Sequence, residues 1–79
     1  MGILDIFRGS PDERIAKRLM AELRAAGETR RMEFDKAAGL VVTFDEKGAR
    51  AGFHNIANLR YEIERTPPAE HDAVYRRFV

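Results

Sequence analysis

Cysteine is absent from this sequence of 79 residues, and neither sign of charge dominates it. Without cysteine no disulfide can staple the fold and no thiolate can bind a metal, an absence that is consistent with the cytosol. Fourteen lysines and arginines against thirteen aspartates and glutamates leave a formal net charge of +1. The sequence therefore lacks the positive field of a dedicated nucleic-acid binder, and nucleic acid is not the expected partner.

Long apolar runs are also missing. The longest apolar cluster lies within residues 1–7 and is interrupted by Asp5, whereas a membrane helix needs about 20 apolar residues. The same residues lack the basic start and the small-residue cleavage site of a secretory signal. We therefore expect a soluble cytoplasmic protein with no membrane partner.

The residues that are present have the composition of a small globular domain. Apolar residues make up 44% and charged residues 34% of the chain, and such values are typical of folded rather than disordered proteins. A chain this short buries roughly 60% of its unfolded surface, so the stability margin is thin. We expect residues 1–79 to form a single small domain.

A strong helix signal begins at Ser10. Ser10 can cap the helix, Pro11 suits the first helical position, and Glu13 completes a capping box. Gly27 supplies the left-handed conformation that often ends a helix. The apolar positions that recur with helical spacing between these signals are Ile15, Leu19, Leu23 and Ala26. The pattern predicts a helix over residues 11–26 with one apolar side.

The period changes after this helix. Residues 31–35 alternate between polar and apolar, and residues 40–44 are rich in β-branched and aromatic side chains. Turn-forming residues at 36–39 and 45–48 separate these segments from a weaker candidate strand at 49–53. We predict an antiparallel meander of two or three strands, covered by the apolar side of the first helix. The expected packing partners of the helix are Met32, Phe34, Val42 or Phe44.

The segment that follows Asn55 allows two interpretations. Its apolar residues Ile56, Leu59 and Ile63 have helical spacing. Residues 59–64 also alternate, as a strand does. Because Asn55 can cap a helix and most of the segment has good helix propensity, we predict a helix over residues 55–65.

A last helix is expected after Pro67 and Pro68, with Val74 and Phe78 on its buried edge. The sequence stops within this pattern without a glycine cap. It is either the N-terminal piece of a longer protein or a chain whose natural terminus docks on its own core. The whole pattern predicts an α+β fold. An N-terminal helix packs on a small antiparallel two- or three-stranded meander, and two C-terminal helices follow.

Three stretches of the sequence are similar to a known family. They are FHNIANLRYE at residues 53–62, TPPAE at 66–70 and YRRFV at 75–79. Over roughly residues 30–79 the chain resembles the front part of the YtpQ-like family of bacterial proteins, whose function is unknown. The resemblance implies a bacterial cytosolic protein with a larger C-terminal portion, and it supports a helix over residues 55–65. It implies no activity and no cofactor.

Side chains that could carry catalysis or bind a metal are few and scattered. His54 and His71 are seventeen residues apart, and a metal site needs three or four convergent ligands. Ser10 is the only serine and is explained as a helix cap. The acidic pairs Asp12/Glu13, Asp45/Glu46 and Glu62/Glu64 lie at an expected cap, turn and exposed face. We therefore expect no catalytic, cofactor-binding or metal-binding residue, and no enzyme within these 79 residues.

Four cations share one side of the first predicted helix. They are Arg14, Lys17, Arg18 and Arg24, which fall within about 120° on a helical wheel, opposite the apolar stripe. They could bind phosphates or an acidic partner. The alternative is a solvated side with the local ion pairs Glu13–Lys17 and Arg18–Glu22, each four residues apart. We favour the solvated side, because no aromatic residue lies between the cations for base stacking.

The N-terminal apolar cluster consists of Ile3, Leu4, Ile6 and Phe7. It either packs on the sheet or the helices, or it forms an exposed patch that recruits a partner. The leading hypothesis is a non-catalytic interaction or accessory domain, whose partner is another protein or the rest of a longer chain. Its order of elements resembles one half of secretion-chaperone-like folds, which grip extended partners along a sheet. The alternative hypothesis is nucleic-acid or acidic-partner binding through the basic side of the first helix.

Overall fold

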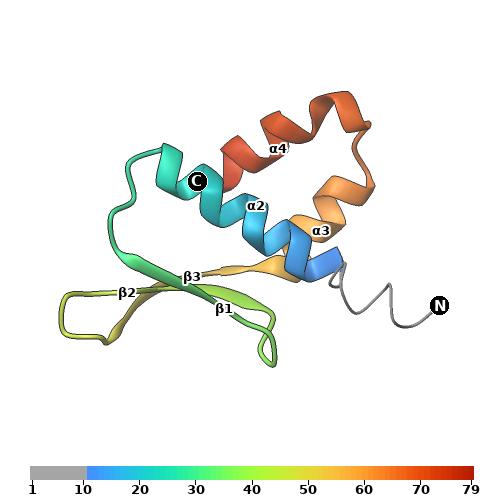
Figure 1. The fold of residues 1–79 in the computed structure, drawn as a ribbon. Helices are drawn as coiled ribbons and strands as arrows, with labels where there is room; N and C mark the ends of the chain where they lie inside the picture. Colours follow the sequence, from blue (N-terminus) through green and yellow to red (C-terminus); the bar gives the residue numbers. More distant parts are fainter. Residues whose placement is uncertain (1–10) are drawn as a thin grey trace.

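One helix precedes and two helices follow a three-stranded sheet in residues 11–79, the part of the chain that the computed structural model describes (Figure 1). The elements are α2 (Pro11–Ala25), β1 (Arg31–Asp35), β2 (Leu40–Phe44), β3 (Arg50–Asn55), α3 (Ile56–Glu64), the short 3₁₀ helix η1 (Pro68–Glu70) and α4 (His71–Phe78). The predicted α+β fold is confirmed, and the meander has three strands.

Helix α2 presents its small and branched apolar residues to the core. Ala16, Leu19 and Leu23 are buried, whereas Ile15 is only partly buried, less than predicted. The acidic residues of the first turn lie at the positive end of the helix dipole. The helix ends just before Gly27, whose φ of 108° is a conformation that side chains with a Cβ rarely adopt.

The three strands form one antiparallel sheet in the order β1-β2-β3. Successive side chains of a strand point to opposite faces, so the register decides which residues meet the helices. Val41 lies in the core with Met32 and Phe34 packed against it. Of the predicted packing partners, Met32 and Phe34 pack on the core, whereas Val42 and Phe44 point to the opposite face of β2.

Helix α3 begins directly at the end of β3. The Asn55 side chain accepts hydrogen bonds from the backbone N–H groups of Ala57 (2.9 Å) and Asn58 (3.4 Å). Ile56 and Leu59 are fully buried one turn apart. The predicted helix over residues 55–65 is therefore confirmed, and the alternative strand is wrong.

Helix α4 closes the helical layer. Its buried residues are Val74 and Tyr75, and Phe78 is partly buried. The ring of His71 at its start is hydrogen bonded to the Thr66 carbonyl at 2.9 Å, which fixes the turn between α3 and α4. The predicted last helix is confirmed, with Tyr75 joining Val74 in the core.

Helices α2, α3 and α4 lie on one side of the sheet, as Figure 1 shows. The main core cluster contains residues from α2, α3 and α4 and, from the strands, Val41 with partly buried neighbours on β1. The fold is thus a two-layer arrangement with its core between the helices and one face of the sheet. Within residues 11–79, no helix lies on the other face.

Candidate functional site

The face of the sheet that the helices leave uncovered is here named the outer face. The strand register places nine residues on it: Arg31, Glu33 and Asp35 from β1, Leu40, Val42 and Phe44 from β2, and Arg50, Phe53 and Asn55 from β3. A bulge between Thr43 and Phe44 brings Arg50 opposite Phe44. No helix of residues 11–79 covers the outer face.

The central strand has apolar residues on both of its faces. Val41 points into the core together with Thr43, while Leu40, Val42 and Phe44 point outward. Apolar residues on both faces are typical of a strand that is covered on both faces, whereas a half-exposed strand usually alternates. The sequence LVVTF carried this signal, although it was interpreted only as a strand that packs on one helix. The outer face therefore has the apolar composition of a surface against which another segment can pack.

Long side chains from the edge strands partly provide that cover. The Arg31 guanidinium stacks over the Phe44 ring at 4.1 Å from its centroid and forms an ion pair with Glu33. The Arg50 guanidinium lies 3.2 Å from the Asp35 carboxylate. Arginine stems can cover apolar surface while their charged ends stay in water. Val42, in the middle of the face, is consequently only 1% exposed.

Phe53 is the apolar side chain that this arrangement leaves in solvent. It lies beside Val42 on β3 and is 67% exposed. Tyr61 on α3 is also exposed, at 55%, but Arg65 stacks on its ring at 4.9 Å and donates a hydrogen bond to its hydroxyl. Within residues 11–79, arginine side chains stack on the rings of Phe44, Tyr61 and Tyr75 but not on that of Phe53. An exposed phenylalanine next to a buried apolar strand is a candidate contact residue.

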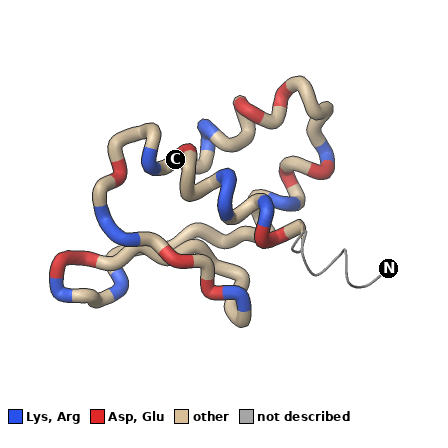
Figure 2. The backbone as a smooth tube through the Cα atoms, in the orientation of Figure 1, with Lys and Arg blue, Asp and Glu red and all other residues tan. Residues whose placement is uncertain are grey.

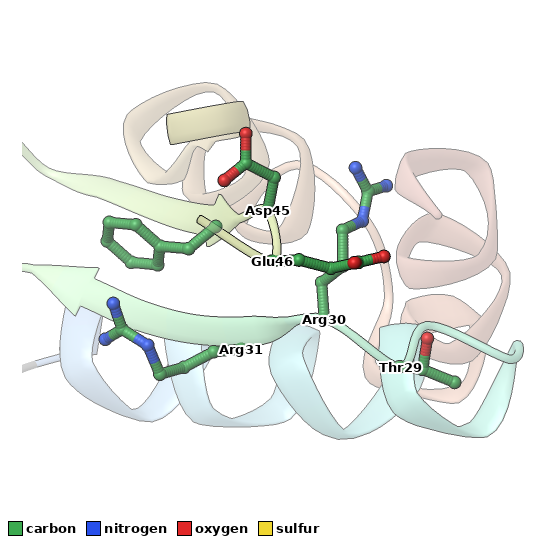
Figure 3. Close-up of a pocket in the computed structure, with 6 residues that line it drawn as sticks. Thr29, Arg30, Arg31, Asp45 and Glu46 are labelled. Atoms are coloured by element: carbon green, nitrogen blue, oxygen red, sulfur yellow. The ribbon is translucent and has the colours of Figure 1, made fainter. Parts of the chain in front are cut away.

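A shallow cavity of about 270 Å³ opens where β1 begins and β2 ends (Figure 3). It is lined by Thr29, Arg30, Arg31, Phe44, Asp45 and Glu46. Two of its polar groups are already engaged: Arg30 binds the Glu28 carboxylate at 3.0 Å, and Asp45 accepts hydrogen bonds from the N–H groups of its own turn. Because side chains of both charge signs line the cavity, it favours neither an anion nor a cation as a ligand. It is a shallow depression beside the Phe44 ring.

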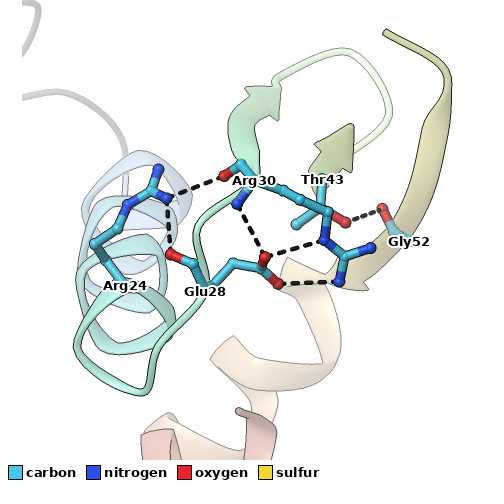
Figure 4. Close-up of polar contacts among 5 residues, drawn as sticks. All are labelled: Arg24, Glu28, Arg30, Thr43 and Gly52. Atoms are coloured by element: carbon cyan, nitrogen blue, oxygen red, sulfur yellow. Dashed lines mark hydrogen bonds and ion pairs between the residues drawn. The ribbon is translucent and has the colours of Figure 1, made fainter. Parts of the chain in front are cut away.

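A polar network fixes the loop between α2 and β1 (Figure 4). The Arg24 guanidinium donates to the carbonyl oxygens of Glu28 (2.8 Å) and Arg30 (3.1 Å). The Glu28 carboxylate accepts from both the backbone and the guanidinium of Arg30, and these hydrogen bonds lower the pKa of Glu28. Arg24, predicted as part of a basic surface, is thus committed to holding this loop.

Arg18 joins α2 to α4. It forms ion pairs with Glu22 (2.9 Å) and with Asp72, and its guanidinium lies 4.6 Å from the centroid of the Tyr75 ring. The hydrogen bond from Arg18 holds the pKa of the Asp72 carboxyl below its usual range. Burial raises the pKa of the Tyr75 hydroxyl. With a side chain that is 40% exposed, Arg18 acts as a contact between helices as well as a surface cation.

The other two predicted cations, Arg14 and Lys17, are exposed on α2. The predicted Arg18–Glu22 pair is confirmed. In place of the predicted Glu13–Lys17 pair, Glu13 lies 3.5 Å from Lys36 of the β1–β2 turn. Figure 2 shows basic and acidic residues interleaved along the helices and loops, with no extended stretch of one sign.

The remaining predictions concern metal ligands, membrane spans and the residues near the N-terminus. No group of three or more histidine, aspartate or glutamate side chains in residues 11–79 could hold a metal ion. Across the same residues, every helix is too short or too polar to cross a bilayer. The predicted contact residues Ile3, Leu4, Ile6 and Phe7, and the predicted cap Ser10, lie outside the described residues.

Comparisons with known proteins gave no match. No protein-family model matches the sequence, and neither the curated proteins nor the solved structures contain a match. The resemblance to the YtpQ-like family stays a prediction.

Proposed function

We propose that this chain is a non-catalytic interaction module, and that its outer face binds a short apolar segment of a partner protein. The observation that carries the proposal is the 67% exposure of Phe53 beside the apolar residues Val42 and Phe44 on the outer face of the central strand. Burial of apolar surface stabilises a complex by roughly 25 cal/mol for each Å² that is removed from water. A partner that covers Phe53 therefore gains a contact that the fold itself leaves unused.

The size of the outer face favours a segment over a globular partner. Three strands of about five residues span roughly 15 by 17 Å, whereas a standard interface between globular proteins buries about 800 Å² on each side. A single extended or helical segment matches these dimensions. A globular partner would have to find most of its contacts elsewhere.

The residues around Phe53 are suited to an interface of this kind. Aromatic and arginine side chains contribute most to binding energy at protein interfaces. Here Phe53 and Phe44 can form the apolar centre, while Arg31 and Arg50 lie at the rim with their carboxylate partners. The mixed signs of the rim favour a partner segment that is apolar in the middle and carries little net charge.

Selection of a displayed peptide library on the immobilised chain tests the proposal. We expect enrichment of peptides with at least one aromatic or branched aliphatic residue. Binding of the enriched peptides should be lost in a Phe53→Asp variant, because burying a carboxylate in an apolar contact removes its hydration, which costs free energy. Tyr61→Asp is the matched control, since Tyr61 is the other exposed aromatic ring and lies on α3.

Amide chemical-shift mapping of an enriched peptide then locates its site. The proposal expects the largest shifts at Phe53, Phe44 and Leu40. Peptides that bind Phe53→Asp and the native chain equally, or that shift the α2 amides instead, would refute it.

The alternative, nucleic-acid or acidic-partner binding through α2, has less support. Arg18 and Arg24 make contacts within the fold, and they would have to give these up to bind phosphates. Phosphate binding weakens steeply with salt. A salt titration with a generic duplex and a single strand separates this alternative from apolar docking, which salt does not weaken in this way.

A further inference from the structure

Strand β3 forms one edge of the sheet, and no other strand of residues 11–79 lies beyond it. At the end of β3 the Ile56 N–H donates to the Gly39 carbonyl at 3.0 Å. Three residues along each strand, Val42 lies opposite Phe53. Opposite pairs in an antiparallel sheet alternate between hydrogen-bonded and non-hydrogen-bonded pairs. The Val42–Phe53 pair is therefore non-hydrogen-bonded, and the backbone N–H and C=O of Phe53 point away from β2, toward the free edge.

Phe53 thus offers its backbone and its side chain at the same place. Among residues 11–79, no turn or loop donates to or accepts from the backbone of Phe53. Its ring lies on the outer face and is mostly exposed. An edge strand with free N–H and C=O groups is a template for pairing with another strand. A residue of an added strand that lies opposite Phe53 can therefore make two backbone hydrogen bonds and pack on the ring.

The two edges of the sheet differ in charge. Proteins commonly protect an edge strand from pairing with charged side chains, prolines or bulges. Strand β1, at the other edge, carries charged side chains at alternate positions. Beyond Arg50, strand β3 has the sequence AGFHN, which contains no lysine, arginine, aspartate, glutamate or proline. The bulge between Thr43 and Phe44 limits the regular part of β3 to residues 52–55. The β3 edge is therefore open to a short, uncharged strand, whereas charge protects the β1 edge.

We propose that the partner segment binds in an extended conformation, as a fourth strand beside β3, with a branched aliphatic or aromatic side chain packed on the Phe53 ring. This inference rests on the proposed function and specifies how the segment binds. In strand addition the backbone hydrogen bonds supply affinity, and alternate side chains supply specificity. The partner is therefore an uncharged segment of about four residues, with its apolar residue opposite Phe53.

A second copy of the chain is a poorer occupant of the same edge. Two copies that pair along residues 52–55 would share a strip only about 13 Å long. A standard interface between globular proteins buries about 800 Å² on each side, which such a strip does not approach. A flexible segment needs no further contact surface, because it can pair with the edge and adjust its side chains to the Phe53 ring. The dimensions of the edge therefore favour a segment.

Backbone methylation of a peptide that is enriched in the selection tests the pairing. Each N-methyl group removes one N–H donor, and alternate N–H groups of a strand point to its neighbour. We expect a roughly tenfold loss of affinity for the native chain when the N–H groups that face β3 are methylated. Methylation of the N–H groups between them should change the affinity by less than about threefold. Equal losses at successive positions, or no loss at any position, would overturn the added strand.

Amide hydrogen exchange in the chain locates the edge that is used. The bound peptide should slow exchange of the Phe53 amide by about tenfold or more, because this N–H gains an acceptor. Met32 is the matched control. It lies opposite Thr43 on β1, so by the same alternation its N–H points to the other free edge. Slowing at Met32 and not at Phe53 would place the segment on the wrong edge and overturn the proposal.

The outcomes separate this inference from the proposed function. Peptides that bind the native chain but not Phe53→Asp, without the alternating effect of methylation and without slower exchange at Phe53, would lie across the outer face. That result would end the added strand and leave the proposed function standing. A selection that enriches no peptide dependent on Phe53 would end both.

Sedimentation of the chain without peptide tests the second copy. We expect a monomer at the concentrations of the peptide assays. A dimer that Phe53→Asp abolishes would overturn the proposal in favour of pairing between two copies. The fold should survive this substitution, because the Phe53 side chain is exposed.

Discussion

At the scale of single residues, stability depends on a few fully buried side chains. Leu19 is completely buried between the helices and the sheet. Leu19→Ala should lower the free energy of unfolding by about 2–5 kcal/mol, because it removes apolar contacts and leaves a cavity. Urea unfolding followed by circular dichroism measures this loss, which is large compared with the total stability of so small a domain.

Leu40→Ala is the matched control for that change. Leu40 lies on the outer face and is only partly buried, so the same truncation should cost clearly less. Equal losses in the two variants would show that the outer face contributes as much as the core, contrary to the two-layer arrangement.

Arg18 and Lys17 are neighbours with different expected roles. Arg18→Glu removes two ion pairs and the contact with Tyr75, and it places a carboxylate between Glu22 and Asp72. We expect a loss of about 1–2 kcal/mol. Lys17→Glu, on the exposed side of α2, should stay within about 0.5 kcal/mol of the native chain. Thermal melts of both variants test the difference, and similar melting temperatures would contradict a role for Arg18 in docking α4.

At the scale of elements, the junction between β3 and α3 is set by one side chain. The Asn55 side chain satisfies two N–H groups of the first turn of α3. Asn55→Ala should lower stability by about 1 kcal/mol, a typical cost for a lost helix cap. Asn58→Ala is the matched control, since Asn58 is exposed on the same helix and its side chain caps nothing. The midpoints of urea unfolding compare the two, and an equal effect would argue against the cap.

Elements with local signals were predictable from the sequence. Gly27 at the end of α2, the Asn55 cap of α3 and the spacing of Ile56 and Leu59 are readable because helix ends and helix faces depend on residues a few positions apart. The alternation of β1 predicted a strand, but it could not say which face of the sheet the helices cover.

Contacts between distant segments could not be predicted. Arg18 and Asp72 are 54 residues apart, and only the path of α4 brings them together. The candidate site was missed for a similar reason. Phe53 was interpreted as the end of a weak strand, and its exposure follows from the position of β3 at the edge of a sheet with one uncovered face.

At the scale of the whole molecule, one cluster of buried residues joins α2, α3 and α4 to the sheet. Its members come from α2, β2, α3 and α4, so no helix has a core of its own. A small domain of this kind is expected to unfold in one cooperative step. A change at any contact between elements should then appear in the stability of the whole chain.

Acid should lower the stability of the fold by protonating two carboxylates that are paired with arginines. Asp72 binds Arg18 between α2 and α4, and Glu28 binds Arg30 in the loop that leads from α2 to β1. Both arginines lower the pKa of their carboxyl partner in the folded state. Each pair therefore contributes stability that is fully present above the carboxyl pKa of the unfolded chain. This contribution is lost as the pH falls through the lower pKa of the folded state.

Urea midpoints measured from neutral pH into the range where carboxylates protonate should therefore decrease. The decrease should be smaller in an Asp72→Asn variant, which has already lost one of the two pairs and should be less stable at neutral pH. Glu64→Gln is the matched control, because Glu64 is an exposed carboxylate at the end of α3 and its charge links no two elements. Its acid profile should follow that of the native chain. Parallel acid profiles for the native chain and Asp72→Asn would show that the contact between α2 and α4 does not depend on this charge.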